Sequence, residues 1–313
     1  MALEYPHQPV LVHEVVKHLV SIPEGTYVDG TVGTGGHSQA VGKRLSGKGR
    51  LICLDMDPDA VSTSKKRMAF LGDNVRIMKA NYADMDKVLA DLGCKAIDGV
   101  LLDLGMSSYQ LEKSGRGFSF SRNEPLDMRM DPENELTALH LVNNLEPRDL
   151  ERIFKDYGEE RRAKSIARAI VRARLKSPIE TSSRLAAVVK SVFSPSHGSW
   201  ARHPATRTFQ ALRIAVNREL QNLEIFLNEI PLLMAKGGRL VVLSYHSLED
   251  RLVKQTMVNW ERPCTCPPEF PRCVCGKVPL FRRLFKKGIK PSGTEIKNNP
   301  RARSAILRVA ERV

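Results

Sequence analysis

Residues 28–37 read Val-Asp-Gly-Thr-Val-Gly-Thr-Gly-Gly-His, an apolar strand end that runs into a loop with four glycines. Because glycine has no Cβ, such a loop turns sharply and lets a ligand approach the backbone closely. A dinucleotide would place its pyrophosphate over this loop, where the carboxylate of Asp29 would repel it. A cationic or hydrogen-bond-donating group suits Asp29 better, and the amino-acid end of S-adenosylmethionine is such a group. The alternative interpretation is an ordinary turn between a strand and a helix.

The residues after this loop predict three further apolar strands, at 50–55, 75–80 and 99–104. Asp55 ends the first of them, ~20 residues beyond the glycine loop, where nucleotide-binding folds place the carboxylate that bonds ribose hydroxyls. Asp57 competes for that role, and Asp59 is the predicted cap of the next helix. Tyr82 follows the second strand as a platform for adenine or as a core residue, and Asp103 ends the third. Ligands of open parallel sheets bind outside the carboxyl ends of the strands, so we expect one site there.

The chain length and the position of the next strand predict an insertion. At 313 residues the chain exceeds a typical single domain, and the next convincing strand lies at 237–244, preceded by a predicted helix at 216–235. About one hundred residues are left over, far more than a loop normally contains. We therefore predict a discontinuous methyl-donor-binding domain over 1–112 and 217–313, with an all-helical domain inserted at 113–216.

Within the insertion, residues 159–175 have the periodicity of an amphipathic helix. One face is apolar: Ala163, Ile166, Ala167, Ile170, Val171 and Leu175. Another face is basic: Arg161, Lys164, Arg168 and Arg172. This basic stripe suits contacts with phosphates, although a solvated helix face gives the same pattern. Asn-Asn-Leu-Glu-Pro at 143–147 predicts a helix start with proline in its first turn.

A polar loop at 194–204 holds side chains that could stack on or hydrogen-bond unpaired bases: His197, Trp200, Arg202 and His203. Ordinary loop packing is the alternative, and we weigh the two evenly.

The charge distribution favours a polyanionic partner. The net charge is +14 and the sequence pI is near 9.6. Residues 251–313 contain 15 lysines and arginines against 4 acids, and residues 113–216 contain 19 against 12. The remaining residues are slightly acidic, so nucleic acid is the first expectation. An anionic membrane surface is the rival, and a solvated basic face is the alternative for either segment alone. No apolar run reaches ~18 residues and the N-terminus has no secretion-signal pattern, so we expect no membrane contact and a cytoplasmic protein.

Four motifs along the chain resemble one known family. They are Asp29-Gly-Thr-Val-Gly-Thr-Gly-Gly-His-Ser, Asp103-Leu-Gly-Met-Ser-Ser-Tyr-Gln-Leu, Gly237-Gly-Arg-Leu with Ser244-Tyr-His-Ser-Leu-Glu-Asp-Arg, and Asn299-Pro-Arg-Ala-Arg-Ser. The opening His7-Gln-Pro-Val-Leu-Val-His-Glu-Val fits as well. In this order they resemble the bacterial ribosomal RNA small-subunit methyltransferase H (MraW) family over essentially the whole chain.

The resemblance implies a class I S-adenosylmethionine-dependent methyltransferase, a Rossmann-like α/β fold with a mostly parallel sheet and an inserted helical domain that recognises RNA. It also implies methylation of the exocyclic N4 of a cytosine in the decoding region of 16S rRNA within the small ribosomal subunit. The family's donor-binding positions carry over onto Gly35, Gly36, His37, Asp55, Asp103 and Gln110, with Tyr82 where the family often has Phe. Two other functions stay open: a DNA or protein methyltransferase of the same fold, and a non-catalytic ribosome-assembly factor. Monomer and homodimer are equally compatible with the sequence.

A cytosine amino group is a poor nucleophile because its lone pair is delocalised into the ring. A catalytic site must therefore accept a hydrogen bond from the amine and align it with the methyl group. Asp103 is the candidate acceptor or donor-site contact, with Ser107 and Ser108 nearby. His246, together with Tyr245, is the candidate to bind the base or take up its proton, although a loop histidine that orients the backbone fits equally well. Tyr109 is a candidate to stack on a target base that is splayed out of its helix.

The six cysteines fall into two groups. Cys53 and Cys94 have apolar surroundings and are predicted core residues. The other four form a tight cluster: Cys264, Cys266, Cys273 and Cys275. Four thiolates this close can hold a tetrahedral zinc, but Cys-x-Cys is less usual than Cys-x-x-Cys and the intervening Pro-Pro-Glu-Phe-Pro is stiff. We therefore expect no metal and keep a structural zinc, or another structural metal, at the cluster as the alternative. Disulfides do not suit a reducing cytoplasm.

Overall fold

The computed structural model describes residues 9–193, 203–267, 272 and 274–313 of the chain. It divides into two compact units, which are treated separately. The sheet unit comprises residues 1–105 and 220–313, and the helical unit comprises residues 106–219. Four residues singled out above lie outside the described residues: His197, Trp200, Arg202 and Cys273.

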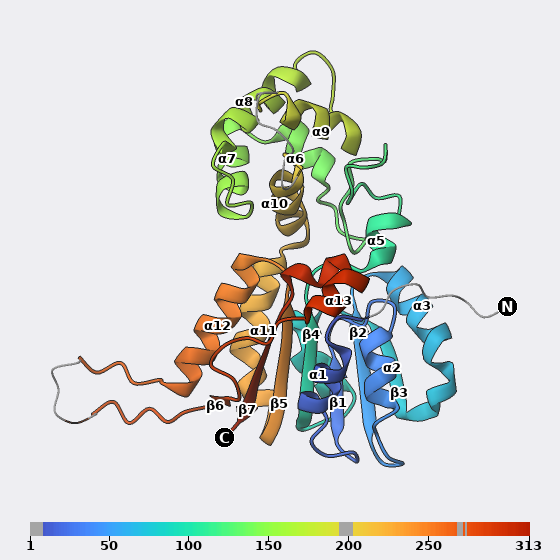
Figure 1. Cartoon of the computed structure of the whole chain (residues 1–313), viewed down its shortest axis with the longest axis vertical. Coiled ribbons are helices and arrows are strands. Elements are labelled where there is room, and N and C mark those ends of the chain that lie inside the picture. Colours follow the sequence, from blue (N-terminus) through green and yellow to red (C-terminus); the bar gives the residue numbers. More distant parts are fainter. Residues whose placement is uncertain (1–8, 194–202, 268–271, 273) are drawn as a thin grey trace. The chain divides into compact units, whose positions relative to one another are not determined.

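The described residues of the sheet unit form one seven-stranded sheet in the order β3-β2-β1-β4-β5-β7-β6 (Figure 1). Its strands are β1 (Thr26–Asp29), β2 (Arg50–Asp55), β3 (Val75–Lys79), β4 (Ile97–Asp103), β5 (Met234–Ser244), β6 (Phe281–Arg283) and β7 (Ile306–Arg312). Strands β1 to β5 are parallel, while β7 pairs antiparallel with both β5 and β6. The strand order reverses between β1 and β4, which is where ligands of such sheets bind.

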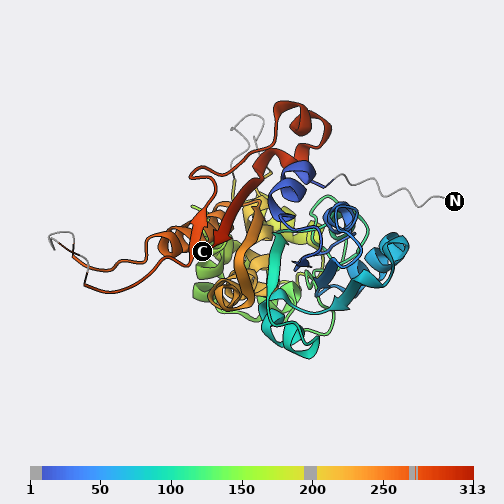
Figure 2. The same cartoon turned by 90° about the horizontal axis from the view of Figure 1, so that it is seen from below.

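Helices cover both faces of this sheet (Figures 1 and 2). One face packs against α4 (Met85–Asp91), α11 (Glu219–Leu233) and α12 (Ser247–Glu261). The other packs against α1 (Val12–Leu19), α2 (Gly36–Gly42) and α3 (Pro58–Met68). Apolar side chains fill both layers, as expected for parallel strands that are buried on their two faces. The sheet unit also contains two shorter elements, η2 (Tyr82–Asp84) and α13 (Gly293–Asn298).

The predicted strands are confirmed, and the largest boundary difference is that β5 begins at Met234 instead of 237. The predicted cap at Asp59 is wrong. Asp57 is the N-cap of α3, and its buried carboxylate accepts the backbone N–H of Asp59 at 3.1 Å. Because Pro58 occupies the first helical position, the cap must precede it, and Asp59 falls within the first turn. Cys53 is a buried core residue, and the half-buried Cys94 packs against the core.

The helical unit contains α5 (Ser108–Glu112), α6 (Ala138–Asn144), α7 (Pro147–Asp156), α8 (Ala163–Arg174), α9 (Ser182–Lys190) and α10 (Thr206–Asn217). Pro147 is at the first position of α7, as predicted. The apolar face of α8 is buried, and its basic stripe is exposed. Leu175 does not belong to the buried face as predicted, because α8 ends at Arg174 and Leu175 is 80 % exposed at its C-cap.

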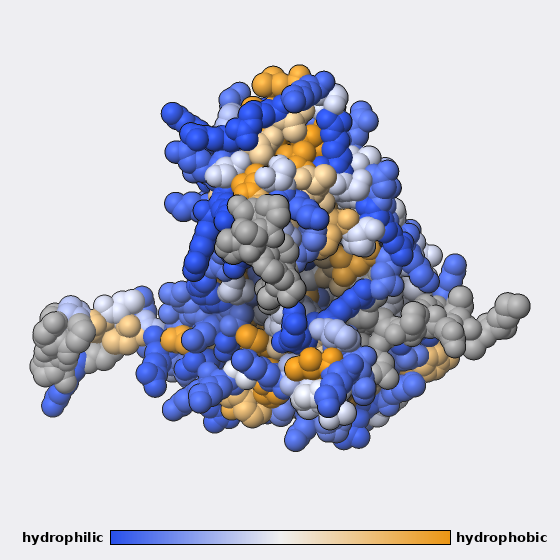
Figure 3. Space-filling model, turned by 45° about the horizontal axis from the view of Figure 1, so that its top comes forward, coloured by the Kyte–Doolittle hydropathy of each residue, from blue (hydrophilic) through white to orange (hydrophobic). Residues whose placement is uncertain are grey.

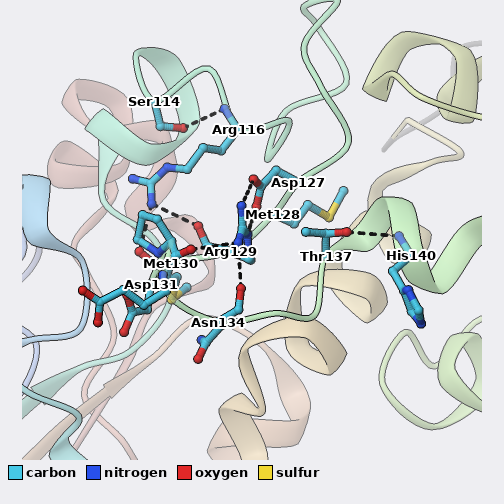
Figure 4. Close-up of polar contacts among 12 residues, drawn as sticks. Ser114, Arg116, Asp127, Met128, Arg129, Met130, Asp131, Asn134, Thr137 and His140 are labelled. Atoms are coloured by element: carbon cyan, nitrogen blue, oxygen red, sulfur yellow. Dashed lines mark hydrogen bonds and ion pairs between the residues drawn. The ribbon is translucent and has the colours of Figure 1, made fainter.

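A loop before α6 is held by polar contacts (Figure 4). Arg129 makes an ion pair with Asp127 at 2.8 Å and donates to the carbonyls of Pro132 and Asn134. Met128 is buried with φ +62°, which is unusual for a residue with a Cβ. The side chain of Asn217 secures this turn, because its amide donates to the Met128 carbonyl and its oxygen accepts the Met130 N–H.

Within the described residues, no helix combines the length and the apolar character that crossing a bilayer requires.

Candidate active site

The glycine loop after β1 is fixed by backbone hydrogen bonds to the neighbouring strand ends. The N–H of Gly30 donates to the Leu101 carbonyl at 2.9 Å, so the loop begins against β4. Asp55, at the end of β2, accepts the N–H of Gly33 at 2.8 Å through Oδ2 and the N–H of Asp57 at 2.9 Å through Oδ1. Burial raises the pKa of Asp55 to about 7, although both N–H groups favour its ionised form.

Asp29 is buried beneath the loop, with 2 % of its surface exposed. Its carboxylate accepts the hydroxyl of Ser38 and the N–H of Thr31. Burial raises the pKa of this carboxyl, and the two hydrogen bonds oppose that effect. Both oxygens of Asp29 hold the loop in place, and a contact of Asp29 with a ligand stays a prediction.

Two glycines of this loop disfavour a side chain, Gly30 because it lacks room and Gly35 because of its backbone conformation. A Cβ at Gly30 would stand 2.5 Å from Cδ2 of Leu102 and 3.0 Å from Cβ of Tyr82. Gly35 has φ +81°, in the left-handed region that favours glycine. Tyr82 packs edge-on against Phe226, with ring centroids 5.8 Å apart. The loop, Asp55 and Tyr82 are therefore adjacent, as the sequence predicts for a donor site.

Asp103 lies at the end of β4 between two side chains from different elements. The hydroxyl of Tyr245 donates to Oδ1 of Asp103 at 2.8 Å, and Nε2 of His37 lies 3.4 Å from Oδ2. The hydroxyl of Thr31 accepts the Asp103 N–H at 2.6 Å. Burial, together with the charge of Asp103, raises the pKa of Tyr245 far above its usual range. Tyr245 therefore keeps its proton and acts as a hydrogen-bond donor to Asp103.

His37 is the one buried polar side chain of this cluster whose ring nitrogens have no hydrogen-bond partner among the described residues. Its side chain is 5 % exposed and lies at the start of α2, directly after the glycine loop. An unsatisfied buried polar group is costly, so its persistence at a site indicates a ligand or water partner.

His246 is the N-cap of α12. Its Nδ1 accepts the N–H of Glu249 at 3.5 Å, and its Nε2 lies 3.1 Å from a carboxylate oxygen of Glu249. The other oxygen of Glu249 accepts the Tyr245 N–H at 3.1 Å. These contacts give His246 a role in ordering the loop after β5, which was the alternative to a catalytic role.

Ser107 and Gln110 belong to the helical unit and form a capping box at the start of α5. The Ser107 hydroxyl accepts the Gln110 N–H at 3.2 Å, and the Gln110 side-chain oxygen accepts the Ser107 N–H at 3.0 Å. The structure thus explains both residues locally as a helix start. Their assignments to catalysis and to the donor stay predictions.

Three hydrogen bonds of the site were not predicted from the sequence. The Ser38 hydroxyl donates to Asp29, the Thr31 hydroxyl accepts the Asp103 N–H, and the Tyr245 hydroxyl donates to Asp103. Thr31 and Ser38 stand in the glycine-rich motif itself, so their position was available as a signal. The partners of Thr31 and Tyr245 were not, because those two bonds join segments that only the folded sheet brings together, whereas Ser38 and Asp29 lie nine positions apart in the same motif.

A mostly parallel sheet of this strand order, with β7 antiparallel, a glycine loop after β1 and carboxylates ending β2 and β4, is the fold of a class I methyltransferase. Within that class the sequence matches the MraW methylase family over residues 4–313. The chain belongs to this family.

Curated relatives agree along the full length. A ribosomal RNA small subunit methyltransferase H from Symbiobacterium thermophilum is 48 % identical over 306 residues, covering 98 % of this chain and 96 % of the relative. The protein of the same name from Heliobacterium modesticaldum is 47 % identical over 310 residues, covering 99 % of both chains. Among solved structures, an rRNA methylase from Streptococcus thermophilus matches with a TM-score of 0.41 and 10 % identity, covering 96 % of this chain and 93 % of that one.

Proposed function

We propose that the protein transfers a methyl group from S-adenosylmethionine to the exocyclic N4 of a cytosine in the decoding region of 16S rRNA, within the small ribosomal subunit. The observation that carries this proposal is the carboxylate of Asp103, held between Tyr245 and His37 beside the glycine loop. The full-length relatives named for small-subunit rRNA support the substrate class, and the sequence motifs support the cytosine amine. The substrate places the reaction in the cytoplasm, and no step requires a second copy of the chain.

The residues at the strand ends fit the proposed donor. The glycines provide close backbone approach, and the buried Nδ1 of His37 makes no hydrogen bond among the described residues, while Nε2 faces Asp103. Asp55 suits the ribose hydroxyls, and Tyr82 suits the adenine face. We assign donor binding to Gly35, Gly36, His37, Asp55, Tyr82, Asp103 and Gln110. S-adenosylmethionine, when bound, supplies an electrophilic methyl group.

The chain's own part in the reaction is to orient the amine and to accept a hydrogen bond from it. Asp103 accepts a hydrogen bond from the exocyclic amine, which localises the nitrogen lone pair and directs it toward the methyl group. Tyr245 orients the Asp103 carboxylate, and Thr31 fixes the backbone of Asp103 by accepting its N–H. We assign Ser107 a contact with the substrate base. We assign His246 two roles: it orders the loop after β5, and it contacts the base.

The direct test is methylation of small subunits from cells that lack this enzyme. Purified subunits are incubated with the protein and methyl-labelled S-adenosylmethionine, and the rRNA is digested to nucleosides for mass spectrometry. We expect N4-methylcytidine from one decoding-region cytosine. Label in DNA or protein substrates instead would favour the other methyltransferase functions. No transfer to any substrate, with donor binding intact, would favour a non-catalytic assembly factor.

Donor affinity should increase with pH around neutrality. In the free protein Asp55 has a pKa of about 7, so it is largely protonated at pH 6 and ionised at pH 8. Ribose hydroxyls donate to the ionised form, so the dissociation constant should be about tenfold lower at pH 8 than at pH 6. Calorimetry in two buffers of different ionisation enthalpy should show proton release on binding at pH 7.

Asp55→Asn is the control for this pH effect, because its side chain cannot titrate. The variant should bind the donor more weakly and with no difference between pH 6 and pH 8. An unchanged pH profile in Asp55→Asn would assign the titration to another group.

The exposed basic stripe of α8 should contribute to subunit binding. Arg168→Glu combined with Arg172→Glu should weaken binding about 10- to 100-fold at low salt, because both positions are exposed and suit phosphate contacts. The slope of log affinity against log salt should fall by about 2. The matched control is Lys65→Glu with Lys66→Glu on exposed positions of α3, which should change affinity less than threefold. Equal losses in both pairs would indicate a general charge effect without a specific contact.

A further inference from the structure

The described residues between α12 and β6, which are 262–267, 272 and 274–280, form an arm in the sheet unit (Figures 1 and 2). The base of the arm is well anchored. The Leu280 N–H donates to the Trp260 carbonyl at 2.9 Å, and the rings of Trp260 and Phe281 stack with centroids 4.5 Å apart. Arg283 makes a partly buried ion pair with Glu261 at the same base. The chain therefore leaves the sheet and returns to it at one defined place.

Beyond this base, the described part of the arm has no helix or strand and no core of its own. Val274 is 73 % exposed and Val278 is 70 % exposed, and Figure 3 shows apolar residues on the outside of the arm. A short segment that buries so little apolar surface cannot offset the entropy of ordering its backbone. Small folds of this kind use disulfides or a metal ion instead.

Three thiols of the arm converge despite this lack of a core. The sulfur atoms of Cys264, Cys266 and Cys275 all lie within 4.8 Å of one another. With Zn–S bonds of about 2.3 Å, thiolates around a tetrahedral zinc are separated by about 3.8 Å, so small side-chain rotations bring these three to zinc-binding distance.

The backbone near the thiols is arranged as expected for thiolate ligands. The N–H of Val274 donates to Sγ of Cys266 at 3.4 Å, and such a hydrogen bond stabilises negative charge on sulfur. Gly276, directly after Cys275, has φ +62° with open space where a Cβ would stand. The left-handed conformation, which favours glycine, turns the chain directly after the last of the three thiols.

We propose that Cys264, Cys266 and Cys275 bind a structural zinc ion that holds the arm in its folded conformation. Three thiolates leave the fourth tetrahedral position to another donor. Cys273 completes the cluster in the sequence, but it lies outside the described residues and the proposal does not depend on it. On binding, each thiol releases its proton to solvent, so affinity rises with pH. The site is independent of the proposed methyl transfer.

The test measures metal content in the full-length protein, purified without chelators and without a metal-affinity tag. Elemental analysis should find about one zinc per chain. Cys264→Ser and Cys275→Ser should each reduce the zinc content at least fivefold. The matched control is Cys94→Ser, a half-buried cysteine outside the arm, which should keep the wild-type zinc content.

A second measurement uses the wild-type chain alone and therefore does not depend on how the variants fold. Cobalt(II) added to the reduced, metal-free protein should give intense thiolate-to-cobalt charge-transfer absorption and the visible bands of tetrahedral coordination, and zinc should displace both. Zinc below a tenth of an equivalent together with no cobalt bands would overturn the proposal. If the protein as purified is zinc-free and has fewer reactive thiols than after treatment with a reductant, the cluster holds a disulfide and the proposal is overturned.

Discussion

Asp103→Asn should lower the turnover number for methyl transfer by about 100- to 1,000-fold at saturating donor. The asparagine can still accept the Tyr245 hydroxyl, so the local packing is kept while the negative charge is lost. That charge strengthens the hydrogen bond from the substrate amine as its nitrogen gains tetrahedral character. The measurement is single-turnover methylation of small subunits with the donor well above its dissociation constant, so weaker donor binding does not contribute.

Tyr245→Phe tests whether the orientation of that carboxylate matters. Phenylalanine removes the 2.8 Å hydrogen bond to Asp103 and little volume, so turnover should fall about tenfold while the Michaelis constant for RNA stays the same. The control is Asp91→Asn, an exposed aspartate that closes α4, which should retain wild-type turnover. Full activity of Asp103→Asn would remove this carboxylate from the mechanism.

Gly30→Ala should weaken donor binding by at least about 30-fold. The added Cβ would stand 2.5 Å from Leu102 and 3.0 Å from the Cβ of Tyr82, and neither atom can easily move. Leu102 is fully buried in the core, and the Cβ of Tyr82 is fixed to the backbone, so overpacking displaces the loop or the aromatic platform. Calorimetric titration with S-adenosylhomocysteine measures the loss.

Gly47→Ala is the matched control, because nothing lies within 4 Å of a Cβ at that position. It should change the donor dissociation constant less than twofold. Thermal unfolding of both variants separates a local effect from a global one, since overpacking here should cost about 1–3 kcal/mol. Wild-type affinity in Gly30→Ala would show that the donor does not depend on the close approach at this turn.

The sheet was largely predictable from local sequence. Apolar runs that end in an acid or a glycine loop determine strands such as β2 and β4, because the strands are buried on both faces and bounded by polar residues. Element ends were less predictable. The N-cap of α3 is Asp57 instead of Asp59, and Leu175 is not part of the buried face of α8. Both features depend on where a helix begins or ends.

The sequence by itself determined the first five strands, the glycine loop, and the presence of acids at the strand ends, but it did not predict β6 or β7. These features are local, since they depend on residue type and spacing within a few positions. Only the tertiary structure decided which groups meet: Asp55 on the Gly33 N–H, Tyr245 on Asp103 across 142 positions, and three thiols at one place in the arm. Partners so far apart in sequence are brought together by strand pairing and by reversals of the chain direction, which no local pattern encodes.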